Sequence, residues 1–510
     1  MTDLLTALLE TCDRRGDTPA LRAASMRLTY RQLGTRIRAT AAGLCAAGLD
    51  DGDRVLFSVR PEPAGVVLAL GIVAAGGTVV FADPGAGPEL FAARLALTGP
   101  RWAAAESLLY GASAWRATRW LARRRGLLLP AYDRLPVRHV YAGRWLPGVP
   151  PGAVSATDLA RGQPLSTVDD APGREALVVL TSGTTSAPRA VVHTRGSLGA
   201  GLTVLAGRCA LGPGDVVHTD QLMLGLPALV AGALWTLPPY GFAPAAEPVR
   251  YAAGLAGVTH TFCVPADFAV VLTAIADGRV PAPAGLRCVL LGGAPVVPEL
   301  LRRARTLVPE AEILSVYGMT EIVPVAIATA DEKLRHTGPG DLAGTALPGV
   351  RARIALDGEL VVSGPNLCRG YLGEAPMAAH ATGDLARLDG DRIVLIGRKK
   401  EMIIRGRVNI YPGLYEPTIA RLDGVAQAVF VGFPDGSGDE RVVLAVVPTD
   451  PGGPPHVLAD AVRSALPRLV DGGALPDEVV VVPAVPVTGR TSKPDRAALR
   501  RILEQRCGSR

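Results

Sequence analysis

The sequence predicts an α/β protein whose large N-terminal domain contains doubly wound mixed sheets, and three observations lead to this fold class. Short apolar runs that suit strands alternate with longer ones that suit helices, as in sheets covered by helices. Residues 340–375 instead alternate apolar and polar side chains between turn residues. A chain of 510 residues is too long for one hydrophobic core, so at least two domains are expected.

The first elements follow the strand–helix–strand pattern. We expect a strand over Arg54–Val59, a helix over Ala64–Ala75 and a strand over Thr78–Ala82. Farther along, Val289–Leu291 is expected to be a strand that ends in a glycine turn. Units of this kind place parallel strands side by side with helices on their faces.

Two uncharged runs, Pro63–Ala82 and Gln221–Ala246, are long enough to cross a membrane, which takes about 20 predominantly apolar residues. Glycines interrupt the first run and prolines interrupt the second. Both runs fit buried α/β segments better, and we therefore predict no transmembrane span.

The period-two pattern predicts that residues 340–397 form a small distorted β-barrel at the end of an N-terminal domain, residues 1–398. After Arg398 the pattern returns to short helices and strands. We expect residues 399–510 to form a small α+β C-terminal domain, which is within normal domain size.

Composition excludes several classes of function. The net charge of +6 is small for this length, so nucleic acid is not an expected partner and an anionic small molecule suffices. The seven cysteines are scattered, with no Cys-x-x-Cys pair, which favours free thiols over a disulfide framework or a zinc site. The first residues lack the layout of a signal peptide, and we expect a cytoplasmic protein. Composition leaves the oligomeric state open.

Residues 116–138 are basic and carry interleaved Trp and Leu side chains. A helix of this kind suits a membrane surface or a carrier protein. The alternative is a solvated helix whose apolar stripe packs on the body of the protein, and this is the interpretation that we favour.

The stretch 177–193, LVVLTSGTTSAPRAVVH, predicts a phosphate-binding loop between two buried strands. Small residues from Thr181 onward let backbone N–H groups approach a polyphosphate, hydroxyl groups add donors, and Arg189 adds a fixed positive charge. The stretch is not a Walker A loop, because no Gly-Lys-Ser/Thr follows at the required spacing. An ordinary polar loop between strands is the alternative.

Three further stretches follow this loop in order: SVYGMTE at 315–321, TGDLARLDGDRIVLIGR at 382–398 and TGRTSKPDRAALR at 488–500. Together the four stretches resemble the signatures of the adenylate-forming, or AMP-binding, superfamily, and in particular acyl-CoA synthetases and fatty acid–AMP ligases. The resemblance covers nearly the whole chain. It implies an enzyme that uses ATP to activate a carboxylic acid as an acyl-adenylate, with release of pyrophosphate.

The resemblance also implies roles for individual residues. Lys493, Thr320 and Glu321 would be catalytic, and Glu321 would hold Mg²⁺, which prefers oxygen ligands. The residues implied to bind ATP and AMP are Thr181, Ser182, Gly183, Thr184, Thr185, Arg189, Gly292, Gly293, Ala294, Pro295, Tyr317, Gly318, Met319, Thr320, Asp384 and Arg398.

The sequence departs from the family pattern inside its phosphate loop and near its lysine motif. The family usually has Gly, Lys and Gly where this chain has Ser186, Arg189 and Ala190, and another Gly where it has Ser492. Arginine keeps the positive charge and can bind phosphate with two hydrogen bonds.

In the family, the C-terminal domain is mobile and rotates about a hinge, which Lys400 matches here. The rotation would remove Lys493 and bring the acceptor loop, Arg405 and Gly406, toward the second substrate. That substrate is a thiol, either CoA or the phosphopantetheine of an acyl carrier protein.

An apolar acyl pocket is predicted from four apolar residues, Leu222, Met223, Leu224 and Leu226. The expected acid is therefore hydrophobic and fatty. Plain core packing of these residues is the alternative. The Trp-containing stretch 115–120 and Pro324–Ala326 are similar to β-lactone synthetases of olefin biosynthesis. Lactone formation from a β-hydroxy acid is therefore a second hypothesis. A degenerate nucleotide-binding protein without activity is a third.

Overall fold

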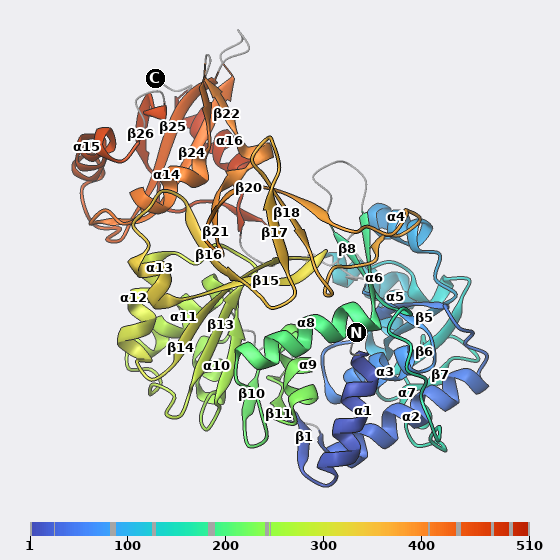
Figure 1. Ribbon diagram of the computed structural model, residues 1–510. Helices are drawn as coiled ribbons and strands as arrows, with labels where there is room; N and C mark the ends of the chain where they lie inside the picture. Colours follow the sequence, from blue (N-terminus) through green and yellow to red (C-terminus); the bar gives the residue numbers. More distant parts are fainter. Residues whose placement is uncertain are drawn as a thin grey trace.

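Two large β-sheets with helices packed between them form the body of the protein (Figure 1). The computed structural model describes residues 3–24, 26–81, 88–124, 129–181, 189–239, 244, 246–405, 408–434, 440–470, 474–488 and 493–507. Over these residues one sheet has thirteen strands and the other has eight. The predicted α/β class is confirmed.

The eight-stranded sheet contains the first predicted unit, and its central strands are parallel. The expected strand, helix and strand are β3 (Arg54–Ser58), α3 (Pro63–Ala74) and β4 (Thr78–Phe81), which confirms them to within a residue or two at each end. The sheet order is β19-β9-β8-β4-β3-β5-β6-β7. The remaining strands are β5 (Trp102–Glu106), β6 (Arg138–Ala142), β7 (Val154–Ser155), β8 (Glu175–Thr181), β9 (Arg189–Thr194) and β19 (Gly370–Tyr371).

The thirteen-stranded sheet is mixed: its strands from β14 to β1 pair in parallel, and those from β17 to β14, together with the edge strand β2, pair antiparallel. Its order is β17-β18-β20-β21-β16-β15-β14-β13-β12-β10-β11-β1-β2. The strands are β1 (Pro19–Arg22), β2 (Arg27–Thr29), β10 (Val216–His218), β11 (Leu234–Thr236), β12 (His260–Cys263), β13 (Cys288–Gly292), β14 (Glu312–Met319), β15 (Ile322–Thr329), β16 (Asp341–Ala346), β17 (Arg351–Ile354), β18 (Glu359–Ser363), β20 (His380–Asp389) and β21 (Arg392–Arg398).

Alternating side chains on the parallel strands separate two cores. On β13, Cys288 and Leu290 face the core between the two sheets, whereas Val289 and Leu291 face the core on the other side. The inner core holds α1 (Leu4–Arg15), α2 (Tyr30–Ala46), α3, α7 (Ala156–Leu159), α8 (Arg195–Arg208) and α9 (Leu222–Ala231). The outer core holds α10 (Pro248–Gly254), α11 (Pro265–Ala276) and α12 (Pro298–Leu307).

The strands predicted as a barrel pack around an apolar core of their own, which contains residues of β15, β16, β18, β20 and β21. Register shifts interrupt the pairing of β16 with β21, of β18 with β20 and of β20 with β21. The sequence did not indicate that β16 pairs with β15, which makes these strands a continuation of the thirteen-stranded sheet.

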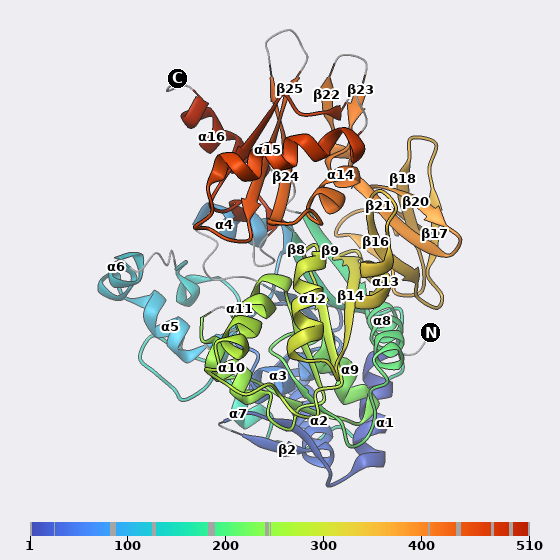
Figure 2. The same ribbon diagram turned by 90° about the vertical axis from the view of Figure 1, so that its left-hand side faces the viewer.

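The residues after 402 build two further cores on the faces of a three-stranded sheet, β24-β25-β26, above the body (Figure 2). Helices α14 and α15 cover one face and α16 covers the other. The elements are β22 (Ile403–Arg405), β23 (Val408–Ile410), α14 (Pro412–Ile419), β24 (Val425–Pro434), β25 (Glu440–Pro448), α15 (Pro455–Ala465), β26 (Glu478–Val481), β27 (Val487–Thr488), β28 (Lys493–Pro494) and α16 (Arg496–Cys507). We call this region the C-terminal domain; the boundary at residues 398 and 399 stays a prediction.

The outer face of the eight-stranded sheet carries α4 (Pro88–Thr98) and α5 (Ser107–Ala114), followed by α6 (Arg116–Arg124). We expected the apolar side chains of this basic stretch to pack on the body. For Trp120 the expectation is wrong, because its side chain is 54% exposed. Among the described residues, no helix combines the length and the apolar character that crossing a membrane requires.

Candidate active site

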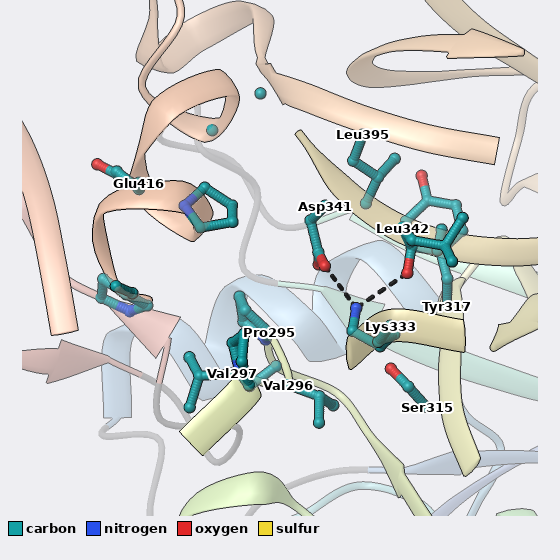
Figure 3. Close-up of a pocket in the computed structure, with 18 of the residues that line it drawn as sticks. Pro295, Val296, Val297, Ser315, Tyr317, Lys333, Asp341, Leu342, Leu395 and Glu416 are labelled. Carbon is teal, nitrogen blue, oxygen red and sulfur yellow. Dashed lines mark hydrogen bonds and ion pairs between the residues drawn. The ribbon is translucent and has the colours of Figure 1, made fainter. Parts of the chain in front are cut away.

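A cavity of about 300 Å³ lies between the thirteen-stranded sheet and the C-terminal domain. The sheet contributes the residues that follow β13 and the end of β14, and the C-terminal domain contributes α14 and residues near Pro494. Figure 3 shows Pro295 and Val297 on one side and Glu416 of α14 on the other. In open α/β sheets, ligands bind outside the carboxyl ends of the strands, which is where this cavity lies.

Asp384 forms the centre of a polar cluster in the cavity wall. The antiparallel register of β20 and β21 places it opposite Arg398. Its Oδ1 lies 3.0 Å from Arg398 Nε, and its Oδ2 accepts a 2.6 Å hydrogen bond from the Tyr317 hydroxyl. Asp384 is buried, and all three residues line the cavity. The structure therefore brings together an aromatic ring, a carboxylate and a guanidinium from three different strands.

Burial and the neighbouring Asp384 raise the pKa of Tyr317 well above its usual value, so this hydroxyl stays protonated and donates. A carboxylate has about four acceptor positions, and the two contacts leave Asp384 able to accept further hydrogen bonds. The cluster thus offers a ring face for a nucleobase, acceptors for a diol and a cation for a phosphate.

The glycine turn after β13 forms another part of the wall. Gly292 ends the strand, and Gly293 has φ of +82°, a left-handed conformation that favours glycine. Ala294 and Pro295 follow the turn and line the same cavity as Tyr317 and Gly318. These predicted residues are therefore brought together.

Thr320 and Glu321 occupy the tight turn between β14 and β15, outside the cavity lining. Met319, the last residue of β14, packs partly buried on the barrel core. His193 of β9 donates its Nε2–H to the Thr320 carbonyl at 2.7 Å. Burial lowers the pKa of His193, so the ring is neutral at physiological pH and the turn is fixed to β9 by a neutral hydrogen bond.

Glu321 and Arg189 meet at one tyrosine. The hydroxyl of Tyr371 donates to Glu321 Oε1 at 2.8 Å, and the guanidinium carbon of Arg189 lies 3.5 Å from the centre of the Tyr371 ring. The other oxygen of Glu321 lies 4.0 Å from His380 Nε2. Arg189 also approaches Glu374, at 3.6 Å. The end of the predicted phosphate loop is therefore next to Glu321.

Several predicted site residues lie outside the part of the chain that the structure describes. These are Ser182, Gly183, Thr184, Thr185 and Gly406, together with the side chains of Thr181, Lys400 and Lys493. The backbone of Lys493 is described: it pairs with Thr488 and directly precedes Pro494, which lines the cavity. Arg405 forms an ion pair with Asp477 of the C-terminal domain.

The predicted acyl-pocket residues lie on α9, away from the cavity described above. Leu224 is 1% exposed and belongs to the core between the sheets. Leu222, Met223 and Leu226 are partly buried against that core. Of the two interpretations that the sequence allowed, core packing describes Leu224.

No pattern in the sequence indicated Tyr371, His380 or a buried lysine at the cavity. Lys333 of α13 (Ala330–Arg335) is 5% exposed, donates to the Leu342 carbonyl at 2.9 Å and pairs with Asp341 (Figure 3). In the sequence, Lys333 belongs to a short charged stretch that is typical of a solvated turn. The ammonium group is buried because it is held by Asp341 and Leu342, the first two residues of β16.

The side chains near Glu321 could hold a metal ion only if a substrate supplied further ligands. Within the described ranges, no three acidic, histidine or cysteine side chains are grouped to hold a metal. Glu321 offers one carboxylate, of which one oxygen is held by Tyr371. Mg²⁺ is commonly bound through one or two carboxylates, waters and substrate phosphates, and Glu321 fits that mode.

Comparison with known families gives two matches along the chain. Residues 8–372 match the AMP-binding enzyme family, and residues 415–491 match the AMP-binding enzyme C-terminal domain. These matches contain Tyr317, Glu321 and Arg189 in the first segment, while Asp384 and Arg398 lie between the two segments.

Similar proteins include a salicylyl-CoA synthase / salicylate adenylyltransferase from Streptomyces sp., which is 30% identical over 98% of this chain and 94% of its own length. An olefin β-lactone synthetase from Stenotrophomonas maltophilia is 28% identical over 93% of this chain and 90% of its own. Among solved structures, an amide bond synthetase from Marinactinospora thermotolerans superposes with a TM-score of 0.80 at 23% identity, covering 98% of this chain and 99% of that chain, which shows the shared fold. The chain therefore belongs to the AMP-binding enzyme family of adenylate-forming ligases.

Proposed function

We propose that this protein activates a hydrophobic carboxylic acid with ATP and transfers the acyl group to a thiol. The observation that carries the proposal is the cluster of Tyr317, Asp384 and Arg398 at a cavity between the two domains. It is a chemically suitable receptor for the adenosine and phosphate of a nucleotide. In this proposal ATP and the thiol are substrates, and the thiol belongs to CoA or to the phosphopantetheine of a carrier protein.

In the first step, an oxygen of the carboxylate attacks the α-phosphorus of ATP, and the bond from that phosphorus to the bridging oxygen breaks. Pyrophosphate leaves, and an acyl-adenylate remains. Two anions must approach each other in line, so the site has to supply positive charge and hold both reactants. We assign that charge to Lys493, Arg398 and Arg189.

In the second step, the sulfur of the thiol attacks the acyl carbon and AMP leaves. The proposed hinge at Lys400 and the acceptor loop at Arg405 and Gly406 act in this step. Mg²⁺, when bound at Glu321, supplies charge neutralisation for the phosphates of ATP. The residues of this chain hold Glu321 in place through Tyr371.

Acid-dependent exchange of labelled pyrophosphate into ATP tests the first step, with a panel of fatty, β-hydroxy and aryl acids. We expect exchange with at least one hydrophobic acid, and mass spectrometry then identifies the product formed with CoA present. Absence of exchange with every acid of the panel would contradict the proposal.

Lactone formation is the second candidate, because an olefin β-lactone synthetase matches 93% of this chain. In this reaction the β-hydroxyl oxygen of the substrate attacks its own acyl carbon and AMP leaves, without a thiol. The same acid panel separates the two: a β-lactone formed without CoA supports this candidate, and an acyl thioester supports the first.

A further inference from the structure

One short segment connects the two charged parts of the candidate site. Residues 367–372 include strand β19, which pairs with β9 through Gly370 opposite Val192 and Tyr371 opposite Val191. At its other end, the Cys368 N–H donates to the Glu321 carbonyl at 2.8 Å. We call residues 367–372 the strap. It is hydrogen-bonded at one end to the turn that carries Glu321 and at the other to the strand that begins with Arg189.

Tyr371 is the strap residue whose side chain contacts both charged groups. It is 8% exposed, so its ring cannot move far without disturbing Val191 and Cys368, against which it packs. Its hydroxyl is directed to Glu321 Oε1, and its ring face carries the guanidinium of Arg189. One rigid side chain therefore sets the distance between an acidic group and a cation.

The contact between Arg189 and the Tyr371 ring suits an arginine at position 189 better than a lysine. A planar guanidinium can stack on an aromatic face, whereas an ammonium group is a hydrated point charge on a flexible stem. Glu374 approaches Arg189 from the same turn region, after the strap. The cation is thus supported by the ring of Tyr371 in the strap and by the carboxylate of Glu374, two residues beyond it.

We propose that Tyr371 is a positioning residue for ATP: its hydroxyl orients Glu321 toward the metal–phosphate group, and its ring orients the Arg189 guanidinium toward the phosphates. The inference rests on the proposed function, because it assigns Tyr371 to the same ATP site. It predicts that arginine supports ATP binding better than lysine at position 189 of this chain.

The two halves of the proposal are separable by substitution. Tyr371→Phe removes the hydroxyl and keeps the ring, whereas Tyr371→Leu removes both. Arg189→Lys keeps the charge and removes the stacking. Tyr141→Phe, on β6, is the matched control outside the site.

The experiment measures equilibrium binding of ATP by calorimetry, in EDTA and across a titration of Mg²⁺, together with the thermal unfolding midpoint. For Tyr371→Phe we expect the ATP affinity in EDTA to stay within about twofold of the parent. The Mg²⁺ concentration at which ATP affinity reaches half of its full increase should rise about tenfold, because one hydrogen bond to a charged group is lost. For Tyr371→Leu and for Arg189→Lys we expect ATP affinity in EDTA to fall about fivefold, a modest cation–π contribution.

A double-mutant cycle completes the test. If the ring acts through Arg189, adding Arg189→Lys to Tyr371→Leu causes little further loss of ATP affinity. Independent losses that add, or a Tyr371→Phe variant with unchanged Mg²⁺ dependence, would overturn the proposal. The proposal would also be overturned if all variants lost the same ATP affinity and had lower unfolding midpoints, because that result indicates a structural role.

The outcome is distinguishable from failure of the proposed function. A parent protein that binds ATP and exchanges pyrophosphate, with Tyr371 variants that behave like Tyr141→Phe, refutes only the positioning role. A parent protein that binds ATP without exchange for any acid refutes the adenylation proposal and leaves the binding test of Tyr371 valid. A parent protein that binds no ATP refutes both.

Discussion

At the residue scale, the candidate site depends on Asp384 more than on any other side chain that the structure describes in full. Its two oxygens are held by Tyr317 at 2.6 Å and Arg398 at 3.0 Å. The carboxylate is buried, so its charge is compensated by Arg398 rather than by water. A ligand diol would meet acceptors whose direction is already set.

Asp384→Asn tests the role of Asp384 as the acceptor for a ligand diol, because the amide keeps the shape of the side chain and loses its charge. Hydrogen bonds to charged groups are worth about 1.5–3 kcal/mol, so we expect kcat/KM for ATP in the exchange assay to fall roughly 10- to 100-fold. Asp389→Asn is the matched control, since Asp389 ends the same strand and is exposed. A variant at 384 as active as the one at 389 would refute the assigned role.

Tyr317, Asp384 and Arg398 could be predicted from the sequence because each stands inside a motif with neighbours that identify it. The contact between Tyr371 and Glu321 could not. Fifty positions separate the two residues, and their meeting depends on a strand of two residues, β19, pairing with β9. A strand of two residues is too short to produce an alternating pattern that could be recognised in the sequence.

At the element scale, some helices and strands could be predicted from the sequence, whereas one strand pairing could not. Helix α3 and strands β3 and β4 were predictable because a fully buried apolar run between glycine turns permits few other arrangements. The pairing of β15 with β16, which joins the barrel strands to the large sheet, was not predictable. Local alternation fixes which face of a strand is apolar, and tertiary packing chooses its neighbour.

The segment that follows Lys493 shows how elements of the C-terminal domain are held together. Arg496, at the start of α16, contacts both oxygens of Glu416 on α14 at 2.7 and 2.8 Å and the Phe430 carbonyl at 2.8 Å. It also reaches Glu401, beside the proposed hinge, at 3.1 Å. One side chain thus ties the lysine segment to the hinge segment and to α14.

Arg496→Lys should loosen this connection, because one ammonium group cannot reproduce the planar fork of a guanidinium. We expect a loss of about 1.5–3 kcal/mol in the unfolding free energy of the C-terminal domain, the worth of a hydrogen bond to a charged group, because lysine keeps the charge and loses donors. Exchange activity should also fall, because the segment that carries Lys493 is then held less firmly. Chemical denaturation followed by circular dichroism measures the first effect.

Arg501→Lys is the control for that experiment, since Arg501 lies on the same helix and is exposed. If both variants unfold at the same denaturant concentration, Arg496 does not hold the elements as described.

At the scale of the whole molecule, buried histidines make the stability of the protein depend on pH. Burial is the first cause that lowers the pKa of His139, His193, His260 and His380 below the usual value of about 6.5. It lowers the pKa of His218 to about 4. These rings are spread over both large sheets, so the effect concerns the N-terminal body as a unit.

The direction of the effect follows from proton uptake. Above about pH 6.5 these rings are neutral in the folded and unfolded chains, and pH has no effect through them. Below it the unfolded chain binds protons that the folded chain does not, so stability decreases as the pH falls, until the folded pKa is reached. For His218 this window extends to about pH 4, and at roughly 1.4 kcal/mol per unit it accounts for roughly 3 kcal/mol.

His218→Asn isolates this contribution, because the amide can still meet Thr236, whose hydroxyl lies 2.8 Å from His218 Nδ1. The unfolding midpoint of the parent should decrease between pH 6.5 and 4.5, and the decrease should be smaller in the variant, since the unfolded variant has one fewer site that takes up a proton. The matched control replaces the exposed His456 on α15 by Asn. Carboxylates contribute equally to all three proteins in this range, so the difference in slope belongs to the histidine. Parallel slopes for the parent and His218→Asn would show that His218 titrates alike in the folded and unfolded chains.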